Sequence, residues 1–202
     1  MKISENLDLI DRSIANCYVL RHDGQVILID TGTKLTGKRI IEYFKSRRQK
    51  PDTVLITHYH TDHTGGLKMI YDEFRPTIFA PELEIPIIQG KERPKPANSL
   101  ISNIIAHAWK ADSVENIQPS ESMDITYIEP ISTPGHTPGS TSYLYRPQNF
   151  FFIGDAFSVS SGSAKINRSF TYDIAMAEKS KAKILSMKNM ILLPGHGGIL
   201  RT

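Results

Sequence analysis

The sequence contains a single cysteine, Cys17, among 202 residues. An internal disulfide is therefore excluded, and so are zinc sites built from several thiolates. Any metal ion that the chain binds must be held by nitrogen and oxygen ligands. Long apolar runs are also missing, because no stretch approaches the roughly 20 residues that a helix needs to cross a bilayer. We expect no membrane association.

Neither positive nor negative charge is in large excess. Lys and Arg total 24 and Asp and Glu total 21, which gives a formal net charge of +3. So small a surplus is not typical of a nucleic-acid-binding protein, and we expect no nucleic-acid partner. The first residues, MKISENLDLIDRS, lack the apolar core of a secretory signal. We therefore expect a cytoplasmic protein, while its oligomeric state stays open.

The apolar patterns change between strand and helix periods in both halves of the chain. A hairpin is predicted around the Asp-Gly turn within 14–30, followed by an amphipathic helix that begins at a capping Thr36 and ends before Pro51. Further strands are predicted at 53–57, 77–80, 124–133, 141–145, 151–155 and 190–195, and further helices at 66–74 and 174–188. The length of 202 residues favours a single domain over residues 1–202. The similar order of elements in the two halves favours a four-layer α/β sandwich.

The segment 81–113 departs from this pattern because it is helical in character and interrupted by prolines. We interpret it as a helical insertion that overhangs a pocket and contributes substrate contacts. Ile105 and Trp109 are its candidate contacts and would suit a small hydrophobic acyl group. Internal packing of these side chains is the alternative, and it is the more common role for apolar residues on a helix.

Five of the seven histidines fall at strand ends or in the loops that follow, and two aspartates occupy comparable places. The candidate metal ligands are His58, His60, Asp62, His63, His136, Asp155 and His196. In an extended loop, His58 and His60 would project to the same side because they lie two positions apart. A turn after Thr61 would direct Asp62 and His63 toward a neighbouring ion. Imidazole and carboxylate ligands favour two divalent ions, with zinc first and iron or manganese as alternatives.

The stretch HYHTDH, residues 58–63, resembles the HxHxDH signature of the metallo-β-lactamase fold superfamily. The later histidine in STPGHTPG, the aspartate in GDA and the histidine in PGHG match its remaining motifs in order. The resemblance implies an αββα sandwich with a binuclear metal site at one edge of the two sheets. It assigns His58, His60 and His136 to one metal, Asp62, His63 and His196 to the other, and Asp155 to a bridging position. Asp30, in VILIDTG, matches a position that supports a metal-bound histidine; an aspartate that caps a turn is the alternative.

Within the superfamily, the ligand set is most similar to that of hydroxyacylglutathione hydrolase, glyoxalase II. This resemblance implies that a metal-bridging hydroxide cleaves a small ester or thioester, with Asp62 as the catalytic residue that orients the hydroxide or carries a proton. Lys165 and Tyr143 are candidate substrate contacts; a solvated lysine and a core tyrosine are the alternatives. The sequence ends soon after His196, so we expect it to lack the helical extension that binds the glutathione carrier in that group.

Other functions stay open on the same motifs. A mononuclear iron persulfide dioxygenase would use only His58, His136 and Asp155. A phosphodiesterase or a lactonase would use the whole set, although the modest charge argues against RNA, and Phe157 stands where homoserine-lactone hydrolases use a tyrosine. A β-lactamase of the thiolate-using class is disfavoured because Asp155 stands in place of its cysteine. A non-catalytic binding protein is disfavoured because every ligand position is filled.

Overall fold

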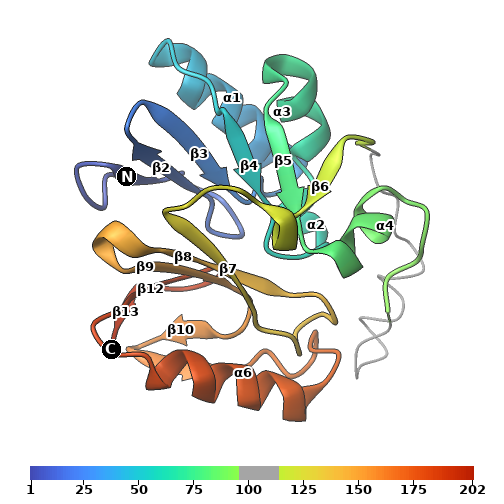
Figure 1. The fold of residues 1–202 in the computed structure, drawn as a ribbon, viewed down its shortest axis with the longest axis vertical. Coiled ribbons are helices and arrows are strands. Elements are labelled where there is room, and N and C mark those ends of the chain that lie inside the picture. Colours follow the sequence, from blue (N-terminus) through green and yellow to red (C-terminus); the bar gives the residue numbers. More distant parts are fainter. Residues whose placement is uncertain (96–113) are drawn as a thin grey trace.

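The computed structural model describes residues 1–95 and 114–202 as four layers (Figure 1). Two β-sheets face each other at the centre. Helices α1 (Lys34–Ser46) and α3 (Leu67–Phe74) cover the outer face of one sheet, and helix α6 (Ile174–Ser186) covers the outer face of the other. This arrangement confirms the αββα sandwich predicted from the sequence. Within the two described ranges, no helix combines the length and the apolar character needed to span a membrane.

The first sheet has the strand order β1-β2-β3-β4-β5-β6 in the described part of the chain. Its strands are β1 (Leu7–Leu9), β2 (Tyr18–His22), β3 (Gln25–Ile29), β4 (Thr53–Leu55), β5 (Thr77–Ala80) and β6 (Ile117–Pro119). Strands β1 to β3 pair antiparallel, whereas β3 to β6 run parallel. The carboxyl ends of β3, β4 and β5 therefore meet at one edge, where the loops that follow them lie together.

The second sheet has the order β13-β12-β9-β8-β7. Its strands are β7 (Ile128–Ser132), β8 (Thr141–Tyr145), β9 (Phe150–Gly154), β12 (Ile191–Pro194) and β13 (Leu200–Arg201). Because β9 and β12 pair in parallel, the loops after both strands also share one edge. Strands β10 (Ser158–Ser160) and β11 (Ser163–Lys165) form a separate hairpin. The remaining short elements are α2 (Thr61–Thr64), α4 (Ile85–Ile88), η1 (Glu82–Glu84), η2 (Ser120–Ser122) and η3 (Arg146–Gln148).

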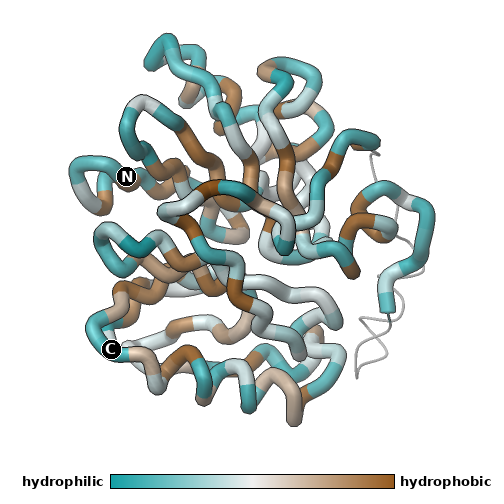
Figure 2. The backbone as a smooth tube through the Cα atoms, in the orientation of Figure 1, coloured by the Kyte–Doolittle hydropathy of each residue, from teal (hydrophilic) through white to brown (hydrophobic). Residues whose placement is uncertain are grey.

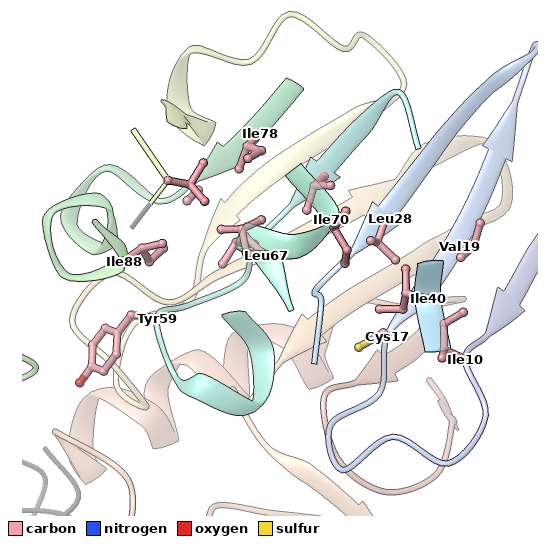
Figure 3. Close-up of a cluster of buried hydrophobic side chains, with 14 of the residues drawn as sticks. Ile10, Cys17, Val19, Leu28, Ile40, Tyr59, Leu67, Ile70, Ile78 and Ile88 are labelled. Carbon is pink, nitrogen blue, oxygen red and sulfur yellow. The ribbon is translucent and has the colours of Figure 1, made fainter. Parts of the chain in front are cut away.

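Buried apolar side chains fill all three spaces between the layers. Ile40, Leu67 and Ile70 pack from α1 and α3 against the first sheet, where Leu28 lies beneath them (Figure 3). In β9, Phe152 contributes to the core between the sheets, and Phe151 to the core under α6. Because both faces of the inner strands are covered, their sequences are apolar without alternation. Figure 2 shows the corresponding concentration of hydrophobic residues in the sheets.

Several boundaries differ from the sequence prediction. Helix α1 begins at Lys34, because the side chain of Thr33 accepts the hydrogen bond from the N–H of Thr36 and so acts as the N-cap. The predicted cap, Thr36, lies inside the first turn. The first part of the predicted insertion forms η1 and α4, and the rest, with Ile105 and Trp109, lies outside the described residues.

Candidate metal centre

The seven candidate ligands come from three loops and from the segment after β4 that includes the short helix α2, at the edge where the strand ends of the two sheets meet. One loop joins β7 to β8, and the other two follow β9 and β12. The structure brings all seven side chains together in overlapping groups whose ligand atoms lie within 4.8 Å of one another. Two of these groups are separate: the first ligand group is His58, His60 and His136, and the second ligand group is Asp62, His63 and His196. The third group, His58, His63 and Asp155, joins them.

The first group consists of three imidazoles that face one point. Nδ1 of His60 lies 3.0 Å from Nε2 of His58 and 2.9 Å from Nε2 of His136. Two nitrogens bound to one tetrahedral zinc ion would be roughly 3.3 Å apart, so these separations are close to those of a ligand set. Burial, aided by the neighbouring imidazoles, holds the pKa of His58 well below its ordinary value and lowers the pKa of His60 to about 3. The rings are therefore neutral near pH 7, as metal binding requires.

The second group combines two imidazoles with a carboxylate. Oδ2 of Asp62 lies 3.1 Å from Nε2 of His196 and 3.9 Å from Nε2 of His63. Burial acts to raise the pKa of Asp62, but the hydrogen bond from His196 and the other imidazoles outweigh it and bring the pKa to about 2. Burial acts to lower the pKa of His63, but the charges of Asp155 and Asp30 hold it well above the ordinary value. A metal ion at this group would need Nε2 of His63 in its unprotonated form.

Asp155 contacts residues of both groups. Its Oδ1 lies 3.3 Å from Nε2 of His63, and its Oδ2 lies 3.5 Å from Nε2 of His136 and 3.4 Å from Nε2 of His196. The neighbouring imidazoles, His63 above all, hold the pKa of Asp155 well below its usual range against the effect of burial. A charged carboxylate in this position is able to bridge two cations.

Two buried atoms in the cluster indicate that these residues fit a metal. Nε2 of His63 and Oδ1 of Asp155 face each other, yet among the described residues neither has a hydrogen-bond partner. Nδ1 of His136 is a third such atom, on the far side of the ring from the nitrogen that faces His60. Buried polar atoms without partners are costly, and a cation bound by His63 and Asp155 would remove that cost.

Asp30 lies next to the cluster and contacts one of its histidines. Its Oδ2 lies 2.7 Å from Nδ1 of His63 and accepts the hydroxyl of Thr57, while its Oδ1 accepts the N–H of Thr57. The Thr57 hydroxyl lies 3.0 Å from Nδ1 of His58. Because that hydroxyl donates to Asp30, it is free to accept from His58. Both histidines thus direct Nε2 into the cluster.

Close backbone approach shapes the loop of His196. A Cβ atom at Gly195 would lie 2.3 Å from Oδ1 of Asp155 and 2.7 Å from Cε1 of His63. Only glycine therefore lets the chain pass this close to the second ligand group. In the PGHG motif, His196 is a candidate ligand, and Gly195 leaves room for the side chains of Asp155 and His63.

The structure places one candidate substrate contact in the core and the other on the β10–β11 hairpin. Tyr143 is fully buried, and its hydroxyl donates to the carbonyl of Ile56 and also contacts Ser120. Lys165 ends β11 with an exposed side chain. This placement favours the core tyrosine and the solvated lysine, the two alternative roles.

Sequence reasoning missed Thr57 and Glu84. Glu84 is fully buried, and its carboxylate accepts hydrogen bonds from residues beside the histidine ligands, including the N–H of Tyr59. Burial raises the pKa of Glu84 to about 7 against the lowering effect of these hydrogen bonds. A threonine at the end of a strand and a glutamate in a short turn carry no local signal of such a role.

The comparison with protein families agrees with this geometry. Residues 10–196 match the model of the metallo-beta-lactamase superfamily, and the chain belongs to this superfamily. Its cluster of histidines and aspartates fits a metal site. The resemblance inferred from the motifs is thereby confirmed.

Among relatives, the chain is 26% identical to the probable metallo-hydrolase YqgX of Bacillus subtilis, with 91% of this chain and 85% of that protein covered. It is 31% identical to the hydroxyacylglutathione hydrolase of Bartonella quintana over 73% of this chain, but it spans only 51% of that protein. Among solved structures, it is similar to TTHA1623 in a di-iron-bound form, with a TM-score of 0.73, 21% identity and coverage of 95% and 92% of the two chains. It is also similar to the B3 metallo-beta-lactamase BLEG-1, with a TM-score of 0.71, 23% identity and coverage of 96% and 92%.

Proposed function

We propose that this protein is a metal-dependent hydrolase that cleaves a small ester or thioester. The observation that carries the proposal is the convergence of seven imidazole and carboxylate side chains in two groups that Asp155 connects. Divalent ions bound by such a set would lower the pKa of a water molecule and polarise an acyl carbonyl, which is the chemistry that acyl hydrolysis needs. Zinc suits the nitrogen and oxygen ligands best, with iron or manganese as alternatives.

Asp62 is the residue that we assign to proton transfer. Its side chain is 31% exposed, whereas those of Asp155 and Asp30 are 11% and 2% exposed. Asp62 is therefore the carboxylate of the site that a substrate and its attacking water reach. Because its pKa is about 2, Asp62 is charged at neutral pH and can accept a hydrogen bond from the attacking water. We assign it to orienting that water and to relaying its proton to the leaving group.

The similarity to a hydroxyacylglutathione hydrolase supports an acyl substrate. Because the chain spans about half of that protein, the similarity does not extend to the whole enzyme, and we leave the thiol carrier out of the proposal. A small-molecule substrate agrees with the position of the cluster among loops at a sheet edge.

One activity panel tests the proposal. Metal-free protein is reconstituted separately with zinc, iron and manganese, and each form is assayed with a thioester, an aryl ester, a lactone, bis(p-nitrophenyl) phosphate and a persulfide. We expect metal-dependent turnover of the thioester or aryl ester, with kcat reduced at least about 100-fold in Asp62→Asn. Turnover of the phosphodiester alone, or oxygen consumption with the persulfide by an iron form, would replace the acyl hydrolase with that activity.

A further inference from the structure

Glu84 lies between two of the loops that supply histidines, although it belongs to neither. It ends the short turn η1, and its side chain is fully buried. Its Oε2 accepts the backbone N–H of Tyr59 at 2.9 Å. Tyr59 stands between His58 and His60, so this hydrogen bond holds the backbone of the first histidine loop.

The other carboxylate oxygen holds the second loop. Oε1 of Glu84 accepts the hydroxyl of Thr137 at 2.9 Å and the N–H of Gly139 at 2.7 Å. Thr137 directly follows His136. One carboxylate thus joins the two loops whose three imidazoles form the first ligand group.

The local sequence is adapted to this carboxylate. A Cβ atom at Gly139 would lie 2.6 Å from Oε1 and 2.8 Å from Cγ of Glu84, so a larger residue would push the carboxylate away. The three hydrogen bonds described above all come from neutral donors, and between them they require both carboxylate oxygens of Glu84 to act as acceptors. A carboxylate meets this need, whereas the amide of glutamine has one acceptor and turns a donor toward the other loop.

We propose that Glu84 is a positioning residue, which holds the loop of His58 and His60 and the loop of His136 at the separation at which their imidazoles bind one metal ion. This inference rests on the metal dependence of the proposed function and adds to it a residue that acts through the ligands. Its role is distinct from that of Asp30, which contacts His63 directly and reaches His58 through Thr57.

Cobalt(II) titration of the metal-free protein, followed by visible absorption, tests the inference without any substrate. We expect Glu84→Gln to weaken one binding step by 10- to 100-fold, the range typical of residues that orient metal ligands. The same loss should persist in a His196→Ala background, because that substitution removes a ligand of the other group. Glu121→Gln is the matched control, since Glu121 is exposed and accepts the N–H of Glu82 in the same turn; it should bind cobalt as the wild type does.

If circular dichroism shows that Glu84→Gln does not fold, a second pair of variants tests the inference. Thr137→Val removes one donor to the carboxylate and should weaken the same step several-fold, whereas Thr137→Ser keeps the hydroxyl and should restore it. Wild-type affinity in folded Glu84→Gln or in Thr137→Val would overturn the inference, as would an equal loss in Glu121→Gln. A wild type that binds cobalt but cleaves no ester or thioester would refute the proposed activity and leave the role of Glu84 standing.

Discussion

Oδ2 of Asp30 lies 2.7 Å from Nδ1 of His63, and this contact is made by a residue in an unusual backbone conformation. Asp30 has a φ of 57°, in the left-handed region that residues with a side chain rarely adopt. Aspartate and asparagine tolerate it better than most residues. The strained turn delivers a carboxylate that serves both ligand groups, because Thr57 passes the hydrogen bond on to His58.

Asp30→Asn is expected to weaken zinc binding by 10- to 100-fold. Asparagine suits the left-handed backbone, so the substitution changes mainly the number of acceptors that face Thr57 and His63. Competition with a chromophoric chelator measures the affinity. Asp23→Asn is a matched control, because Asp23 is exposed and has a φ of 47°. Equal zinc affinity in both variants and the wild type would refute the supporting role of Asp30.

Thr57→Val is expected to lower both the stability of the fold and the affinity for zinc. Valine has nearly the shape of threonine but lacks the hydroxyl that connects Asp30 with His58. Leaving these buried groups without a partner costs about 1–3 kcal/mol of unfolding free energy. Urea unfolding of the metal-free protein measures this loss, and Thr57→Ser should recover most of it. A valine variant as stable as the serine variant would show that the hydroxyl has no such role.

Asp62→Asn is expected to lower kcat at least about 100-fold while at least one metal ion stays bound. The group of His58, His60 and His136 does not include Asp62, so its affinity should change little. Metal analysis of the purified variant, combined with kcat on the best acyl substrate, separates the two effects. Full activity in a variant with an unchanged metal content would remove Asp62 from the reaction.

The stability of the metal-free protein is expected to depend on the charge of Glu84. The pKa of Glu84 is about 7 in the folded protein, against an ordinary value of 4.5 that applies to the unfolded chain. Between these two pH values the folded chain therefore binds more protons than the unfolded chain. Stability therefore falls as pH rises from about 4.5 to 7, by on the order of 3 kcal/mol. The comparison is made by urea unfolding at several pH values, as the difference between the wild type and Glu84→Gln. A difference that does not change with pH would contradict the raised pKa.

The candidate ligands were predictable because they lie in short polar or glycine-rich motifs that follow strands. Asp30 could be predicted for the same reason. Glu84 could not, because its partners Tyr59 and Gly139 lie far from it in the sequence and only the folded chain brings them together. The hydroxyl of Tyr143 likewise finds its partners across the fold.

Strand boundaries show a similar limit. Strands β1 and β6 have three residues each, and neither is fully buried. Such short segments carry too little pattern to be recognised, and they become strands because β2 and β5 offer free edges for pairing. The start of α1 depended on which of two threonines accepted a hydrogen bond, which sequence spacing alone does not decide.

The central claim is that the converging imidazoles and carboxylates bind divalent metal ions. Its most direct test is equilibrium dialysis of the metal-free protein against zinc, followed by metal quantification. About two ions per chain are expected for the wild type, with one lost when His196→Ala removes a ligand of the second group. A folded wild-type protein that retains no metal at micromolar zinc would contradict the account.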